Sequence, residues 1–292
     1  MRTQHTLYTF DQYPLALTRF LPEVAPSGQV LLIGSATAVP QTYYEAFCKW
    51  LAAQGHVVYT FDYRGIGRSK PVTLQGFEAT MSDWGAQDLD AMISYVRREH
   101  PDASLTYVGH SVGGQLPALT PESRHFERVL LIASQIGYRR NWPVPQRWGF
   151  DVVLNLIMPL SSRLYGYFPG SKLGIFHDLP KDVALEWARW CRTKGYLFAL
   201  IPRTYLAHIE ASVFSLSFTD DLFAPEKAAK DLLSHYKNCH IEYRSVRPAD
   251  AGVKKIGHFG FFRKRFADSL WPLVAAWLQQ PLTRTTSHSS AL

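Results

Sequence analysis

The chain has 292 residues, of which 47 % are hydrophobic and 19 % are charged, a composition typical of a globular protein with a buried core. Disorder and low-complexity fibres are therefore excluded, and 19 Gly and 18 Pro without a period of three exclude collagen. The formal net charge of +7 permits an acidic partner. The basic residues are spread along the chain and no recognition motif accompanies them, so we expect no nucleic-acid binding.

Motifs for metals, cofactors and export are missing from the sequence. The three cysteines are far apart and form no CxxC pair, so neither a disulfide framework nor a zinc site is expected. Without an HExxH motif or a P-loop, we expect no metal and no cofactor. The start of the chain has no apolar signal region, and the longest apolar stretch, residues 152–160, is too short for a membrane span. We expect a cytoplasmic protein, and the sequence does not indicate its oligomeric state.

Continuous apolar runs predict buried strands. The first twenty residues contain two β-like segments around Tyr13-Pro14, which predict an antiparallel hairpin at one edge of a sheet. Five runs read as parallel strands with both faces buried, and residues 241–246 alternate like a strand nearer an edge. The five buried runs are residues 30–33, 57–61, 105–108, 129–133 and 213–218.

Helical patterns fall between these strands. We predict helices over residues 43–54, ended by Gly55, and 82–100, begun by Ser82 as N-cap. Two more are predicted over residues 225–236 and 261–278. Strands that alternate with helices indicate an α/β fold with a mostly parallel central sheet flanked by helices.

One long connection interrupts this alternation. Roughly eighty residues separate the strand ending at Ala133 from the one starting near Val213, far more than a normal crossover. The segment is rich in Trp, Tyr, Phe and Pro, and runs such as residues 182–191 predict a helical insertion. We favour an apolar lid, because ligands bind outside the carboxyl ends of such strands; an elaboration with its own small core is the alternative.

The strand over residues 105–108 leads directly into GHSVGG, residues 109–114. This is G-x-S-x-G between a strand and a predicted helix, the context of a nucleophile elbow. The serine sits on a strained turn, so flanking glycines are needed where backbone passes close by. Ser111 is the candidate nucleophile, and the amide of Val112 points into the site.

A serine needs a base within reach and an acid that orients the base. The strand over residues 213–218 ends in Asp220 and Asp221, and either aspartate is a candidate acid. His258 lies in a Gly-flanked loop before the last predicted helix, and the chain order Ser, Asp, His is that of α/β hydrolases. His110 is excluded as the base, because adjacent side chains diverge at such a turn.

Acyl transfer also needs donors for the developing oxyanion. We assign one to the Val112 amide. The second is expected from the loop after the strand over residues 30–33, from the amide of Ala36 or Thr37.

Together these features resemble the α/β-hydrolase superfamily and, more narrowly, a bacterial family of predicted α/β hydrolases described as serine-aminopeptidase-like. The likeness extends to about Phe262. It rests on VPQTYYEAFCKWLA, FDYRGIGRS, SDWGAQDLDA, YVGHSVGGQ, GYFPG, LPKDVALEWARWCR, SFTDDLFAP and IGHFGFFR. The resemblance implies a Ser111–Asp221–His258 triad and a helical cap, and the D-x-x-x-P stretch favours Asp221 over Asp220.

We therefore expect an α/β-hydrolase core over residues 1–136 and 211–280, a helical cap over 137–210 and a flexible tail over 281–292. The expected function is a serine hydrolase that cleaves a small ester, thioester or amide through an acyl-enzyme. The aromatic insertion favours an apolar acyl or aromatic small-molecule substrate. An acyltransferase with the same triad, or a non-catalytic binding protein on this fold, remains an alternative.

Overall fold

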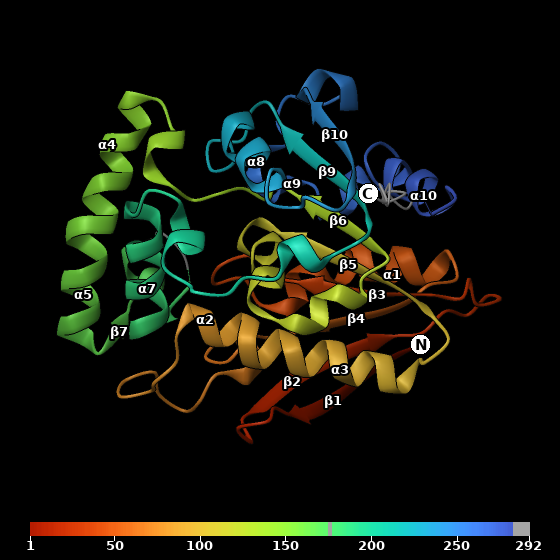
Figure 1. Ribbon diagram of the computed structural model, residues 1–292, viewed down its shortest axis with the longest axis horizontal. Coiled ribbons are helices and arrows are strands. Elements are labelled where there is room, and N and C mark those ends of the chain that lie inside the picture. The colour runs from red at the N-terminus through yellow and green to blue at the C-terminus, as the bar shows by residue number, and fades with distance from the viewer. Residues whose placement is uncertain (175–176, 283–292) are drawn as a thin grey trace, which may run out of the picture.

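The computed structural model describes residues 1–174 and 177–282. Its centre is an eight-stranded sheet in the order β1-β2-β4-β3-β5-β6-β9-β10 (Figure 1). Pairing is parallel from β4 through β10, and antiparallel between β1 and β2 and between β2 and β4. The strands are β1 (Arg2–Tyr8), β2 (Pro14–Phe20), β3 (Gln29–Gly34), β4 (Val57–Phe61), β5 (Ser104–His110), β6 (Arg128–Ile132), β9 (Ser212–Phe218) and β10 (His240–Val246). The predicted α/β class, the edge hairpin and all six later strands are confirmed.

Helices cover both faces of this sheet (Figure 1). They are α1 (Glu45–Ala53), α2 (Met81–Asp83), α3 (Asp90–Glu99), α8 (Glu226–Leu233), α9 (Gly257–Gly260) and α10 (Trp271–Leu278). A π-helical turn, Trp84–Leu89, joins α2 to α3. The predicted helices over residues 43–54, 82–100 and 225–236 are confirmed within a few residues at each end, where helix boundaries are least defined.

The prediction of one helix over residues 261–278 is wrong. The regular helix α10 begins only at Trp271, after a short 3-10 turn at Lys264–Phe266. Pro272 lacks the amide hydrogen that a helix interior requires, so it fits only the first turn of a helix. A helix that started at Phe261 would have placed this proline in its interior.

The predicted N-cap Ser82 is also wrong. The helix begins after Thr80, whose side chain accepts a hydrogen bond from the Asp83 amide while the Asp83 carboxylate accepts one from the Thr80 amide. This reciprocal capping box satisfies two amides that have no intrahelical partner. The Ser82 hydroxyl instead donates to Glu186 at 2.7 Å.

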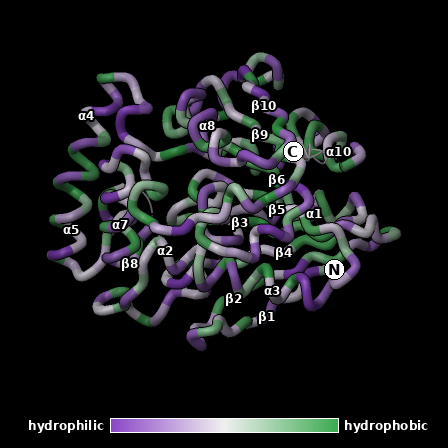
Figure 2. The backbone as a smooth tube through the Cα atoms, viewed as in Figure 1, coloured by the Kyte–Doolittle hydropathy of each residue, from purple (hydrophilic) through white to green (hydrophobic). Residues whose placement is uncertain are grey.

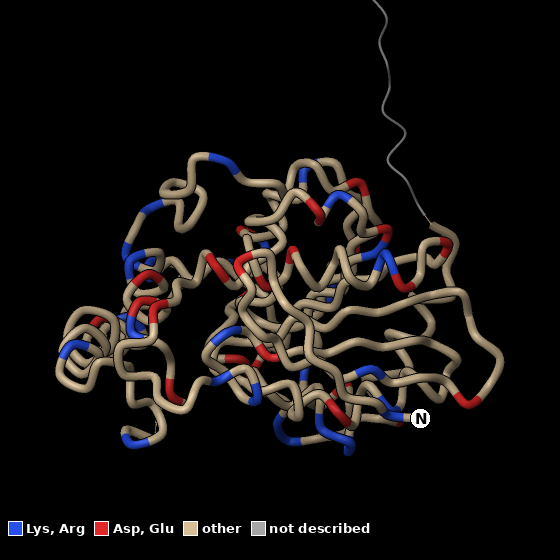
Figure 3. Tube along the Cα trace, turned by 90° about the horizontal axis from the view of Figure 1, so that it is seen from below, with Lys and Arg blue, Asp and Glu red and all other residues tan. Residues whose placement is uncertain are grey.

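Segment 137–210 lies beside the sheet and is mostly helical (Figure 1). It contains α4 (Val144–Val152), a π turn (Val153–Ile157), α5 (Met158–Tyr165), α6 (Gly170–Leu173) and α7 (Lys181–Arg192), with a small pair of strands, β7 (Tyr167–Phe168) and β8 (Leu179–Pro180). The prediction of a helix near residues 182–191 is confirmed by α7. Hydrophobic stretches recur along α4 and α5 (Figure 2), and Lys and Arg outnumber Asp and Glu in this part (Figure 3). The predicted flexible tail, residues 281–292, lies outside the described residues from 283 onward.

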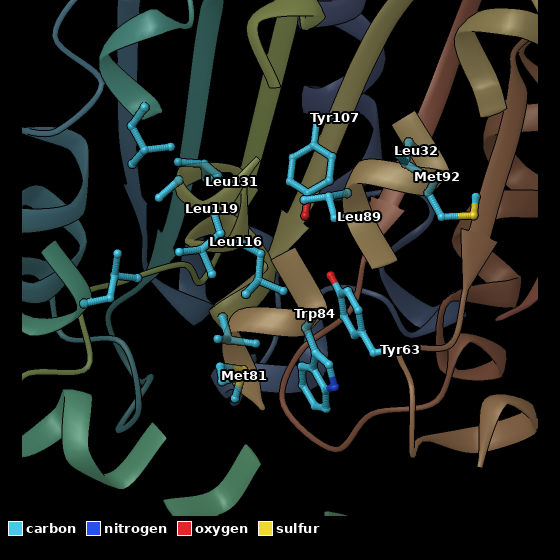
Figure 4. Packing of buried hydrophobic residues seen from close by; sticks show 14 of the residues in the cluster. Leu32, Tyr63, Met81, Trp84, Leu89, Met92, Tyr107, Leu116, Leu119 and Leu131 are labelled. Carbon is cyan, nitrogen blue, oxygen red and sulfur yellow. The ribbon is translucent and has the colours of Figure 1, made fainter. Parts of the chain in front are cut away.

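The buried residues form one apolar core on each face of the sheet. Leu32 and Leu131 belong to the core that includes the π turn and α3 (Figure 4), while Leu31 and Leu130 belong to the core with α1 and α10. Successive side chains of a strand point to opposite faces. A strand covered on both faces is therefore apolar at every position, which explains the continuous runs in the sequence.

Candidate active site

The predicted site residues gather at one edge of the sheet because they follow the carboxyl ends of parallel strands. Ser111 follows β5, Asp221 follows β9 and His258 follows β10. In an open parallel sheet this edge is where ligands bind. Ser111 and His258 line the same pocket, and each is only 7 % exposed.

Ser111 occupies a backbone conformation that side chains rarely adopt, with φ of +53°. The turn holds because its glycines let backbone segments approach closely. A Cβ at Gly113 would lie 2.2 Å from the Gly34 carbonyl oxygen, and one at Gly109 would lie 2.6 Å from the Gly114 Cα. The close contact between Gly113 and Gly34 brings the serine turn against the loop that follows β3. Such strain at a polar side chain is typical of functional sites.

The helix expected after the serine turn is replaced by two 3-10 turns, Ser111–Gly114 and Leu116–Leu119. Pro117 lies in the second turn and has no amide hydrogen, so it cannot donate the hydrogen bond of a continuous α-helix. The strand and the turn of the predicted elbow are present, and the predicted helix after them is replaced by these 3-10 turns.

Asp221 is the aspartate that contacts the imidazole. Its Oδ2 lies 2.8 Å from Nδ1 of His258, and its Oδ1 accepts hydrogen bonds from the amides of Phe223 and Ala224. The carboxylate side chain is fully buried. A buried carboxylate needs such donors, and here they hold it in one orientation toward the ring.

Asp220 has a different role. Its carboxylate accepts hydrogen bonds from the amides of Ile256 at 2.9 Å and Gly257 at 3.1 Å. These amides begin the short helix α9, which carries His258, so that His258 lies in a helical turn rather than in the predicted loop. Asp220 therefore anchors the segment that carries the imidazole.

A buried chain of polar groups connects three segments of the site. The amide of Ala36 donates to Tyr44 Oη at 2.8 Å, Tyr44 Oη lies 2.9 Å from His110 Nδ1, and His110 Nε2 lies 3.0 Å from the His258 carbonyl oxygen. A carbonyl oxygen only accepts, so His110 Nε2 carries the hydrogen. Nδ1 of the neutral ring then accepts from the Tyr44 hydroxyl.

Burial keeps the side chains of Tyr44 and His110 uncharged. It lowers the pKa of His110 well below the ordinary value of 6.5 and raises the pKa of Tyr44 above 10, because a charge on either ring would lack water. Both side chains are completely buried. His110, excluded as a base on its position alone, thus holds together the residues that flank the site.

The same hydrogen-bonded groups distinguish the two amides that were considered as oxyanion donors. The Ala36 amide is occupied by Tyr44. Among the described residues the Thr37 amide has no hydrogen-bond acceptor, and Thr37 lines the pocket together with Ser111. Of these two amides, that of Thr37 is therefore the one without a hydrogen-bond partner within the described part of the chain.

The pocket around Ser111 is largely apolar. Segment 137–210 forms one wall and the ends of the sheet strands form the other. Its lining residues are Ala36, Thr37, Ser111, Gln135, Gly137, Arg139, Trp142, Phe150, Leu154, Trp187, Cys191, Phe223, His258 and Phe259. The charge of Arg139 is paired with Asp151, so the lining carries no uncompensated cation. Such a lining fits an apolar group.

The two phenylalanines beside the imidazole were not predicted from the sequence. The ring centroids of Phe223 and Phe259 lie 5.4 and 4.9 Å from that of His258. The available signal was their position, because Phe223 follows Asp221 by two residues and Phe259 follows His258 directly. Residues next to catalytic candidates at strand ends are themselves candidates for the pocket wall.

Within residues 1–174 and 177–282, no three His, Cys, Asp or Glu side chains are grouped so that they could hold a metal ion. No described helix has the length and apolar character that a membrane crossing requires.

A comparison with known protein families matches slightly more than half of the chain. A family model described as serine aminopeptidase, S33, matches residues 29–180. The match includes β3 through β6, the Ser111 turn and most of segment 137–210. It confirms the resemblance inferred from the sequence motifs.

Solved structures with the same fold confirm the α/β-hydrolase architecture over nearly the whole chain. An esterase of Pyrococcus furiosus is 14 % identical, with a TM-score of 0.62 and coverage of 97 % of this chain and 92 % of that one. An α/β serine hydrolase of Xanthomonas campestris, described as lacking a lid, is 14 % identical, with a TM-score of 0.56 and 96 % coverage of both chains. A bromoperoxidase of Bacillus anthracis is 15 % identical, with a TM-score of 0.59 and coverage of 95 % and 100 %. These names differ, so the shared fold alone does not determine the reaction.

Proposed function

The chain belongs to the serine aminopeptidase S33 family of α/β hydrolases, and on that premise we propose that it is a serine hydrolase acting through an acyl-enzyme. Ser111 is the nucleophile, His258 the general base and Asp221 the residue that orients the base. The observation that carries the proposal is the 2.8 Å contact between Asp221 Oδ2 and His258 Nδ1, beside a pocket that His258 shares with the strained Ser111.

The proton transfers follow from this contact. Because the Asp221 carboxylate accepts the hydrogen of His258 Nδ1, the other ring nitrogen, Nε2, is left to accept a proton. As Ser111 Oγ attacks the substrate carbonyl carbon, its proton passes to Nε2, and the imidazolium then protonates the leaving group. In the second half-reaction Nε2 takes a proton from the water that attacks the acyl carbon, and that proton passes to Ser111 Oγ as the bond to the acyl group breaks.

The developing negative charge on the carbonyl oxygen requires amide donors that are already in place. We propose the amides of Val112 and Thr37 for this role. Both come from segments held by the contact of Gly113 with Gly34 and by the Ala36–Tyr44–His110 chain. Since these donors need no reorientation during the reaction, they stabilise the charged intermediate more than water does.

We propose segment 137–210 as a cap over an α/β-hydrolase core formed by residues 1–136 and 211–280. Trp142, Phe150, Leu154 and Trp187 of this segment line the pocket that contains Ser111. Burying an aromatic or long aliphatic side chain contributes about 1.5–3 kcal/mol. The substrate is accordingly a small ester, thioester or amide with an apolar acyl or aromatic group, held against this wall.

The experiment is hydrolysis of p-nitrophenyl esters of graded acyl length by the wild type and by Ser111→Ala, Asp221→Asn and Asp220→Asn. We expect Ser111→Ala to lower kcat by roughly 10⁶-fold and Asp221→Asn by roughly 10⁴-fold, with the fold intact. Asp220→Asn is the matched control, because it alters a backbone anchor rather than the imidazole contact, and should reduce kcat much less.

Two results would contradict the proposal. Undiminished turnover by Ser111→Ala would remove the nucleophile, and an equal loss in the two aspartate variants would remove the assignment of Asp221. Product analysis with an added alcohol separates hydrolysis from acyl transfer, because a transferase would release the new ester instead of the acid.

A further inference from the structure

The outer surface of segment 137–210 carries a row of exposed apolar side chains. The helical run α4, the π turn and α5 is continuous over Val144–Tyr165 and forms the edge of the molecule farthest from the sheet (Figure 1). Every fourth residue along it is a large apolar one that is 50 to 76 % exposed. We call this set the outer stripe. It consists of Val144, Trp148, Val152, Leu156, Leu160 and Leu164.

The outer stripe winds slowly around the outward side of the helical run, because each step of four residues drifts by about 40°. In an α-helix a step of four residues advances slightly more than one turn, but a π turn holds more residues, so the drift around the axis is smaller across Val153–Ile157. On the opposite face Phe150 is half-buried and Leu154 is buried, and both line the pocket of Ser111. The run is therefore apolar toward both the pocket and the outside.

A contiguous apolar row of this size is unusual on a protein surface. Exposed apolar residues are normally scattered, and large contiguous patches mark surfaces that bind a protein or a membrane. The recurring hydrophobic stretches of α4 and α5 are visible in Figure 2.

The charge around the outer stripe is positive. Between residues 139 and 173 the only acidic residue is Asp151, and it is paired with Arg139. Arg140, Arg163 and Lys172 are exposed. Segment 137–210 contains ten Lys or Arg and five Asp or Glu, which is +5 of the chain's formal +7 (Figure 3).

This charge distinguishes between two occupants of the outer stripe. A second copy of the chain docked stripe to stripe would bring two positive surfaces together, which opposes binding. An anionic lipid surface satisfies both features, because apolar side chains enter the acyl boundary while Lys and Arg meet the negative head groups.

We propose that the outer stripe binds the surface of an anionic lipid layer, with the helical run lying in the plane of the interface. The proposal rests on the proposed function and deepens it. When the outer stripe contacts lipid, Phe150 and Leu154 on the other side of the same helical run still line the pocket of Ser111. The pocket then lies next to the lipid surface, so the substrate class is an acyl ester held in that surface.

The test uses the full chain in co-sedimentation with vesicles of phosphatidylglycerol and phosphatidylcholine, compared with vesicles of phosphatidylcholine alone. We expect binding to the anionic vesicles that weakens as salt is raised. Trp148→Ser combined with Leu160→Ser removes two large apolar side chains and should weaken partitioning by roughly 10- to 100-fold. Arg140→Gln with Arg163→Gln should remove the preference for anionic vesicles.

The matched control is Phe10→Ser with Val72→Ser, which removes two highly exposed apolar side chains elsewhere on the chain and should leave vesicle binding unchanged. Equal binding by the wild type and the stripe variant, or no binding by either, would overturn the proposal. So would a wild-type dimer in sedimentation velocity that the stripe variant abolishes, because the occupant would then be a second copy.

A short water-soluble ester separates this proposal from the proposed function. The stripe variant should hydrolyse p-nitrophenyl acetate as the wild type does, because Trp148 and Leu160 do not line the pocket. It should lose activity only on ester substrate embedded in anionic vesicles. Loss of activity on the short ester upon Ser111→Ala tests the catalytic assignment independently of any lipid.

Discussion

Removing the hydroxyl of Tyr44 tests whether the buried polar chain holds the site together. In Tyr44→Phe the Ala36 amide loses its acceptor and His110 Nδ1 loses its donor. Tyr44 and His110 are completely buried, so water cannot replace the hydroxyl without repacking. Each unsatisfied buried group costs about 1–3 kcal/mol. For two such groups the free energy of unfolding should therefore fall by about 2–6 kcal/mol. A typical protein has a free energy of unfolding of about 5–15 kcal/mol, so this is a large part of it.

Stability is measured by urea denaturation, with the check that the m-value is the same in the wild type and the variant. Activity is measured by ester hydrolysis. Because Ala36 precedes the proposed donor Thr37 and His110 precedes Ser111, kcat should fall while KM changes little. Tyr43→Phe is the matched control, since the Tyr43 hydroxyl donates to a single carbonyl, that of Phe259, at a half-buried position. It should cost less than about 1 kcal/mol. If the free energy of unfolding fell by less than about 0.5 kcal/mol in Tyr44→Phe, the Ala36–Tyr44–His110 hydrogen bonds would not hold the site together.

Two further predictions concern the backbone and the protonation of the site. Gly113→Ala places a Cβ 2.2 Å from the Gly34 carbonyl oxygen and should destabilise the protein by more than about 4 kcal/mol. The control is Gly149→Ala on α4, where the new Cβ lies in open space, so this variant should be as stable as the wild type or more stable. Equal stability of the two variants in urea denaturation would contradict the predicted steric clash at Gly113. Nitrogen NMR should show His110 as the neutral ring with hydrogen on Nε2 from about pH 8 to about pH 5. Because its pKa is lowered in the folded state, the unfolded chain binds the extra proton, so the stability contributed by His110 is complete above about pH 6.5 and decreases as the pH falls below that value. A ring that protonates near its ordinary pKa would show that the site is open to water.

The sheet and the chemistry-bearing strand ends were predictable from the sequence because both leave local signals. Strands covered on two faces produce continuous apolar runs, and the strained turn at Ser111 requires Gly109 and Gly113 at fixed spacing. Asp221 was preferred to Asp220 because of the D-x-x-x-P stretch that begins at Asp221. In the structure the Asp221 carboxylate contacts the His258 imidazole.

The remaining features depend on contacts between distant parts of the chain, which leave no local pattern. Nothing around Ala36 indicates that Tyr44 occupies its amide, and nothing around His110 indicates a bond to the carbonyl of His258. The N-cap was misplaced for a related reason, since Ser82 and Thr80 are both good caps and the hydroxyl of Ser82 is taken by Glu186 from segment 137–210.

Reaction with a fluorophosphonate probe reports directly on whether Ser111 is an activated nucleophile, because the probe traps only a serine whose hydroxyl is activated by a base. We predict one covalent adduct, located on Ser111 by peptide mass spectrometry. Labelling should be lost in Ser111→Ala and strongly slowed in His258→Ala, while both variants keep the circular dichroism of the wild type. An adduct on any other residue, or an unlabelled folded wild type, would contradict this prediction.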